Sequence, residues 1–160
     1  MCPPDLLRRL KALQAVVVTQ PAFIYYSGER YLSEVPEEQL RWLYRTKSFL
    51  RSGLKPAASS DCPVVSPGPL TGIYAAVTRK AENGQVLLPE ETISPEEALR
   101  LYTIAGAYAS FEEHLKGSIE VGKLADMVVL SADPIGVTPD EIKEISVEKT
   151  IIGGEVVWER

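Results

Sequence analysis

The sequence predicts an α/β fold that carries a small antiparallel β unit at its C-terminal end. Three observations lead to this prediction. Amphipathic helical segments alternate with short apolar strands over residues 4–61. A strong helix start stands at Ser94, and the last forty or so residues change to a strand pattern around Gly153 and Gly154. We therefore expect one domain, or one domain with a small appendage.

Composition agrees with a globular protein. The chain has 160 residues, of which 45% are hydrophobic and 24% are charged, so it can bury a substantial core. Cys2 and Cys62 are too few for a disulfide framework, and no secretory signal pattern opens the chain. No apolar run approaches the roughly 20 residues that span a bilayer. We expect a cytoplasmic protein without a membrane partner.

Charge argues against a nucleic-acid partner, because the net charge is −5 and phosphate backbones are bound by basic residues. The charge is uneven along the chain. Residues 1–80 carry 11 basic and 6 acidic side chains (+5), whereas residues 81–160 carry 6 and 16 (−10). This asymmetry fits either two unlike halves or two solvated faces of one domain.

The first elements alternate between helix and strand. Leu6, Leu7, Leu10 and Leu13 follow a proline-rich start at helical spacing and predict a short amphipathic helix. Residues 15–20 form a β-branched run without polar alternation, which is typical of a parallel strand covered on both faces.

The next predicted elements are a loop, a helix and a strand that ends at the carboxylate of Asp61. Residues 22–36 are rich in irregularly spaced aromatic side chains and are interpreted as a long functional βα loop. A helix is predicted over residues 37–51, ended by Gly53 as a left-handed cap. Residues 54–60 then form a strand of small side chains that ends at Asp61.

The second half contains helices followed by strands. Residues 70–80 predict a helix, and Asn83 with Gly84 predicts a turn. Ser94 starts a helix that reaches about residue 110, with proline and glutamate in the favoured first positions. The rest predicts a strand, a helical turn and a hairpin, over residues 126–130, 139–144, and 147–152 with 155–159.

The sequence offers only weak evidence for two other sites, a phosphate-binding loop and a catalytic Cys–His pair. Residues 117–123 nearly match a phosphate-binding loop, but Leu124 stands where a hydroxyl must bind magnesium, and the segment joins a helix to a strand rather than the reverse. Cys62 and His114 are the available thiol and imidazole, and Cys62 lies in a loop that would not lower its pKa. One histidine and scattered acids do not assemble a zinc site in any usual spacing.

Asp61 stands out because of its position. The C-terminal ends of parallel strands hold the chemistry in α/β sheets and barrels, since loops converge there. The alternative is that the Asp61 carboxylate caps the following turn. The residues alone leave both interpretations open.

Three segments and the closing hairpin resemble the C-terminal portion of the amidohydrolase superfamily, in particular the amidohydrolase family 3 branch of metal-dependent hydrolases. They are residues 58–64, 93–99 and 117–130, the last reading G-S-I-E-V-G-K-L-A-D-M-V-V-L, together with residues 151–158. The resemblance covers essentially the whole chain. It implies the last β/α units of a TIM-like (β/α)8 barrel over residues 1–116 and part of a composite β-sandwich over residues 117–160.

By this resemblance, residues 15–20 and 54–60 are barrel strands seven and eight, and Asp61 is the strand-eight aspartate. That aspartate approaches the metal, takes a proton from the metal-activated water and passes it to the leaving amine. Gln20, Tyr25 and Ser60 are the expected substrate-binding residues. The resemblance implies a divalent metal such as zinc and a small-molecule substrate with a non-peptide C–N (amide) bond.

The family's remaining metal ligands have no counterpart in this chain. They are a His-x-His pair, a bridging carboxylate or carboxylated lysine, and two further histidines. The chain therefore resembles the last third of an enzyme, and two function classes stay open. It supplies Asp61 to a hydrolase that another polypeptide completes, or it is a non-catalytic remnant or interaction module. We expect the isolated chain to be inactive, to hold no tightly bound metal, and to self-associate or require the missing barrel part.

Overall fold

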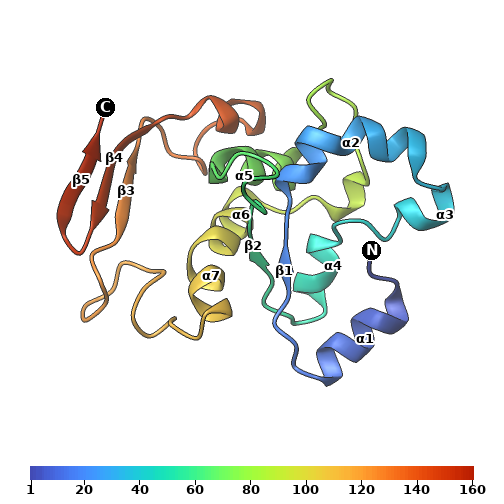
Figure 1. The fold of residues 1–160 in the computed structure, drawn as a ribbon, viewed down its shortest axis with the longest axis horizontal. Helices are drawn as coiled ribbons and strands as arrows, with labels where there is room; N and C mark the ends of the chain where they lie inside the picture. Colours follow the sequence, from blue (N-terminus) through green and yellow to red (C-terminus); the bar gives the residue numbers. More distant parts are fainter.

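The computed structural model describes residues 1–160 as a mixed α/β fold with two separate small sheets. Helices surround a parallel pair of strands, and an antiparallel three-stranded sheet stands at one end of the molecule (Figure 1). The helices are α1 (Pro4–Ala12), α2 (Ala22–Glu34), α3 (Glu37–Leu40), α4 (Thr46–Arg51), α5 (Pro69–Thr78), α6 (Pro95–Tyr102) and α7 (Ile104–Ala109), with 3-10 turns η1 (Pro89–Glu91) and η2 (Pro139–Glu144). The strands are β1 (Val18–Thr19), β2 (Ala57–Ala58), β3 (Met127–Leu130), β4 (Val147–Ile152) and β5 (Glu155–Glu159).

The parallel pair β1 and β2 lies where the sequence predicts two strands, but it is shorter. Val18 aligns with Ala57 and Thr19 with Ala58. The Ser59 N–H donates to the Thr19 carbonyl at 2.9 Å. Each strand has only one neighbour, so regular pairing does not extend along the whole apolar run.

The prediction of a long loop over residues 22–36 is wrong, because Ala22–Glu34 forms helix α2. Its buried face includes Ile24 and Gly28, four residues apart. A Cβ on Gly28 would approach the Ala81 Cβ to 2.8 Å, so glycine lets α2 pack closely against the segment after α5. The scattered aromatic residues concealed this helical spacing.

The helix predicted over residues 37–51 is divided into α3 and α4 by a break at Tyr44, whose φ is +43°. The Tyr44 carbonyl accepts hydrogen bonds from the Thr46 N–H at 2.8 Å and from Arg79 Nη1 at 3.0 Å. Gly53 has φ +84°, as its predicted role as a left-handed cap requires. The helix predicted from Ser94 likewise divides into α6 and α7, at Thr103.

The core is centred on α5. The side chains of Ile73 and Val77 pack with Leu101 of α6 and Ile142 of η2 in one buried cluster. α5 is buried almost all round because α2, α6 and η2 all contact it. The helix thereby joins the first half of the chain to the segment that leads into the antiparallel sheet.

The predicted helix start at Ser94 is confirmed as a reciprocal capping box. The Ser94 hydroxyl accepts from the Glu97 N–H at 3.1 Å, and the Glu97 carboxylate accepts from the Ser94 N–H at 2.8 Å. We expect Ser94→Ala to lower the free energy of unfolding by about 1 kcal/mol, because one helix N–H loses its acceptor. Urea denaturation measures this change. Ser33→Ala, on an exposed part of α2, is the control, and equal losses in both variants would contradict the capping role.

The C-terminal sheet is an antiparallel meander in the order β3-β4-β5. Gly153 and Gly154 form its predicted hairpin turn, with φ of +59° and +88°. The Gly153 N–H donates to Asp126 Oδ1 at 2.8 Å, which ties this turn to the start of β3. Apolar side chains on this sheet stay exposed, among them Val128, Val157 and Trp158.

In the loop that resembles a phosphate-binding motif, residues 117–123, the Lys123 ammonium is paired with side chains of the same loop. Lys123 Nζ contacts the Ser118 hydroxyl and lies 3.6 Å from the Glu120 carboxylate. The Lys123 side chain is only 11% exposed, so it is not presented to a phosphate. None of the helices combines the length and the apolar character that a membrane-spanning segment requires.

Candidate functional site

Asp61 lies three residues beyond Ala58, the last residue of β2, on the carboxyl side of the parallel pair. It is exposed and takes a left-handed conformation with φ +60°. Its carbonyl accepts from the Val64 N–H at 2.9 Å, and the Cys62 N–H is bound instead by the Ser60 hydroxyl at 3.2 Å. The Asp61 carboxylate makes no hydrogen bond within the chain, so the structure gives no support to the alternative in which it caps the turn.

Two other predicted site residues lie near this end of the strands. Gln20 follows β1, and its Nε2 donates to the Ser59 hydroxyl at 3.3 Å. The parallel register places the ends of β1 and β2 side by side, so Gln20 and Ser59 bridge them. Ser60 is half-buried, and its hydroxyl is engaged with the Cys62 N–H.

Tyr25, the remaining predicted substrate-binding residue, lies in α2 and is half-buried. Its ring packs edge-on against Tyr74 of α5, with centroids 5.8 Å apart, and against Tyr26 at 5.1 Å. These contacts give Tyr25 a packing role between α2 and α5. A contact of Tyr25 with substrate stays a prediction.

The structure brings together no group of three or more His, Cys, Asp or Glu side chains that could hold a metal ion. Cys62 and His114 are both exposed, and no hydrogen bond joins them. Asp61 is accordingly a single carboxylate without neighbouring ligands. The residues of this chain do not by themselves fit a divalent metal, which needs three or four protein ligands.

A buried ionic network that the sequence did not reveal joins α4 to η1. Glu91 accepts from the Ser48 N–H at 2.9 Å and from the Ser48 hydroxyl, and it lies 3.6 Å from Arg45 Nε. Arg79 is 1% exposed and donates from Nε to the Leu87 carbonyl at 3.0 Å. Burial lowers the pKa of Arg79 to about 10, and the charge of Glu91 opposes this shift.

Arg79 links the end of α5 to the break between α3 and α4, because its Nη1 donates a hydrogen bond to the Tyr44 carbonyl. No local signal marks Arg79 in the sequence, since a basic residue after an apolar helix is usually an exposed cap. The pairing of Glu91 with Ser48 is likewise a contact between distant segments. Such partners become visible only in three dimensions.

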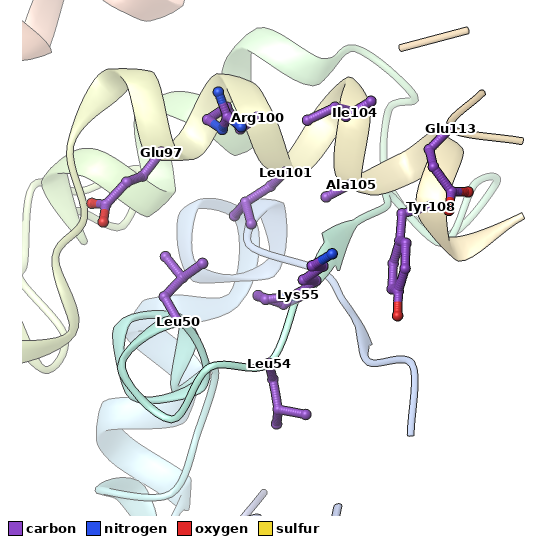
Figure 2. Close-up of a pocket in the computed structure, with 11 residues that line it drawn as sticks. Leu50, Leu54, Lys55, Glu97, Arg100, Leu101, Ile104, Ala105, Tyr108 and Glu113 are labelled. Carbon is purple, nitrogen blue, oxygen red and sulfur yellow. The ribbon is translucent and has the colours of Figure 1, made fainter. Parts of the chain in front are cut away.

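A cavity of about 310 Å³ opens near the amino end of β2, where Leu54, Lys55 and Pro56 precede the strand (Figure 2). Asp61 follows the opposite, carboxyl end of the same strand. The remaining lining side chains come from α4, α6, α7 and the segment after α7: Leu50, Glu97, Arg100, Leu101, Ile104, Ala105, Tyr108 and Glu113. None of the predicted site residues lines this cavity.

Comparisons with known proteins agree on one family. The model of the amidohydrolase family matches residues 1–158. The N-substituted formamide deformylase of Arthrobacter pascens is 33% identical over 154 residues, which are 96% of this chain and 28% of that protein.

Solved structures give the same result. An uncharacterized metal-dependent hydrolase from Pyrococcus furiosus has a TM-score of 0.70 and 36% identity, covering 83% of this chain and 27% of that one. A second such hydrolase, from Pyrococcus horikoshii, has a TM-score of 0.75 and 29% identity, covering 86% of this chain and 28% of that one.

The chain thus spans 27–28% of the length of these relatives, and the part it matches is their C-terminal part. The sequence-based resemblance is confirmed, because a family match extends over nearly every residue and the folds superpose. The chain belongs to the amidohydrolase family.

Proposed function

We propose that this chain is the C-terminal part of a cytoplasmic, metal-dependent hydrolase that cleaves a non-peptide amide C–N bond in a small molecule. In this proposal β1 and β2 are strands seven and eight of a (β/α)8 barrel. Residues 1–116 are the last barrel units, and residues 117–160 belong to a β-sandwich. Membership of the amidohydrolase family and similarity to a formamide deformylase and to metal-dependent hydrolases support it.

One observation carries the proposal: an unengaged carboxylate, Asp61, stands at the carboxyl end of a parallel strand pair. Barrel enzymes place their chemistry at this end. A carboxylate that makes no hydrogen bond within its own chain is free to accept a proton from the attacking water and to return it to the leaving amine. Gln20, which bridges the two strand ends, would bind substrate there.

A divalent metal such as zinc would polarise the scissile carbonyl of the substrate. Asp61 is the single ligand that this chain offers at the proposed site. The other ligands would come from residues outside this chain, which agrees with the small share of each relative that the chain covers.

Hydrolysis of an N-substituted formamide, with zinc supplied, tests this proposal. The chain is assayed alone and after coexpression with the N-terminal barrel part of a relative. We expect turnover only in the combined sample, together with stoichiometric metal. A combined sample that binds metal and folds but does not turn over any amide would instead favour a non-catalytic interaction module.

The isolated chain is expected to self-associate. β1 and β2 each have one unpaired edge, and Val18 of β1 is 51% exposed. An open apolar edge is a template for pairing with another chain. Sedimentation at micromolar concentration measures this, and Val18→Lys should shift the distribution toward the monomer. A uniform 17.6 kDa species for the unmodified chain would contradict the expectation.

A further inference from the structure

The backbone of Asp61 is held on both sides by hydrogen bonds that do not involve its own side chain. The Ser60 hydroxyl accepts from the Cys62 N–H at 3.2 Å, and the Asp61 carbonyl accepts from the Val64 N–H at 2.9 Å. A serine hydroxyl that accepts from the N–H two residues later closes a small turn around the residue between them. Asp61 is the residue that this turn encloses.

Asp61 depends on this turn because its φ of +60° lies in the left-handed region. That region is unfavourable for residues with a Cβ, and residues persist there where the surrounding structure fixes them. The Asp61 side chain is exposed and makes no hydrogen bond within the chain. The direction of its carboxylate is therefore set by the backbone turn.

The turn is anchored to the parallel pair β1 and β2, which run side by side between the helices (Figure 1). The Ser59 N–H donates to the Thr19 carbonyl at 2.9 Å, and Gln20 Nε2 donates to the Ser59 hydroxyl at 3.3 Å. These two bonds fix Ser59 to the end of β1, and Ser60 follows it directly. Ser60 thus joins a fixed point of the sheet to the turn that presents Asp61.

We infer that Ser60 is a positioning residue, which acts on the proposed reaction through Asp61 and does not bind substrate. The inference rests on the proposed hydrolase function, in which Asp61 transfers a proton. It gives Ser60 a role different from the substrate contact that the family resemblance implies, because the contact that the Ser60 hydroxyl makes is with the Cys62 N–H. Proton transfer requires donor and acceptor within hydrogen-bond reach, so a displaced carboxylate slows the chemical step and leaves substrate binding unchanged.

Steady-state kinetics test this role in the hydrolase completed by coexpression with the N-terminal barrel part of a relative. Ser60→Ala should lower kcat about tenfold and change KM by no more than about twofold. Ser60→Thr should keep kcat within about threefold of the unmodified enzyme, because a threonine hydroxyl can accept from the same N–H. Ser66→Ala is the matched control, since the Ser66 hydroxyl accepts from the Gly68 N–H at 3.4 Å in an equivalent turn of the same loop.

Amide exchange measures the turn itself in the 160-residue chain and requires no hydrolysis. NMR of the ¹⁵N-labelled chain should show the Cys62 N–H exchanging with water about fivefold faster in Ser60→Ala, because this N–H loses its acceptor. Ser66→Ala should leave the exchange rate of Cys62 unchanged. A combined sample without turnover would contradict the proposed function, whereas an unchanged Cys62 exchange rate in Ser60→Ala would contradict this inference.

The kinetic results can also overturn the inference. A raised KM with unchanged kcat in Ser60→Ala would show that Ser60 contacts substrate. Equal losses of kcat in Ser60→Ala and Ser66→Ala would reveal a general effect on the loop and no specific role of Ser60. A Ser60→Thr variant that loses as much kcat as Ser60→Ala would show that the hydroxyl is not the group that matters.

Discussion

Asp61→Asn is expected to lower kcat of the completed hydrolase by about 10² or more, because the amide cannot accept the proton of the attacking water. The backbone should remain unchanged. Asp61 takes φ +60°, a left-handed conformation that asparagine adopts as readily as aspartate. Its carboxylate makes no hydrogen bond within the chain, so the substitution removes no internal contact. Steady-state kinetics and thermal unfolding of the same samples measure the two effects.

Asp5→Asn is the matched control, because Asp5 is also an exposed aspartate and lies in the first turn of α1. Cys62→Ser and His114→Ala should leave kcat within a factor of a few, since no hydrogen bond joins either side chain to the other or to the Asp61 carboxylate. If Asp61→Asn keeps nearly full activity, the assignment of the proton transfer to this strand end is wrong.

Local patterns were sufficient to predict the elements that depend on local chemistry. The capping box at Ser94, the Gly153 hairpin turn and the left-handed cap at Gly53 all require specific residues at fixed positions, and all are confirmed. The β-branched run over residues 15–20 and the small side chains over residues 54–60 likewise predict two strands, and the structure pairs them in parallel. The position of Asp61 followed from the order of these elements.

Tertiary contacts decided the elements that the sequence did not predict. Tyr44 breaks a helix because its carbonyl is bound by the buried Arg79, a residue distant in sequence. Helix α2 is not predicted because its aromatic side chains are irregularly spaced, although Ile24 packs in a buried cluster with Tyr31 and Leu32 of the same helix. The cavity lined by Lys55 and Glu113 had no sequence signal, since these residues belong to segments that only folding brings together.

The motif that carried the family resemblance begins at Gly117, and the structure gives a physical reason for that glycine. Gly117 has φ +94°, and it lies directly against α7. A Cβ at this position would stand 2.8 Å from the Ala107 Cβ and 2.9 Å from the Ile104 Cα. The second contact is with helix backbone, which cannot move aside without shifting α7.

Gly117→Ala is therefore expected to lower the free energy of unfolding by about 3 kcal/mol, the sum of the left-handed backbone penalty and the overpacking. Gly122→Ala is a matched control, because Gly122 has nearly the same φ of +92° but no atom within 4 Å of the point that an alanine Cβ would occupy. Gly122→Ala should lower the free energy of unfolding only by the backbone component, about 1 kcal/mol. Urea denaturation of both variants isolates the packing component as the difference between them. Equal losses would show that the glycine is required for backbone conformation alone and that the close contact of residue 117 with α7 is not needed for stability.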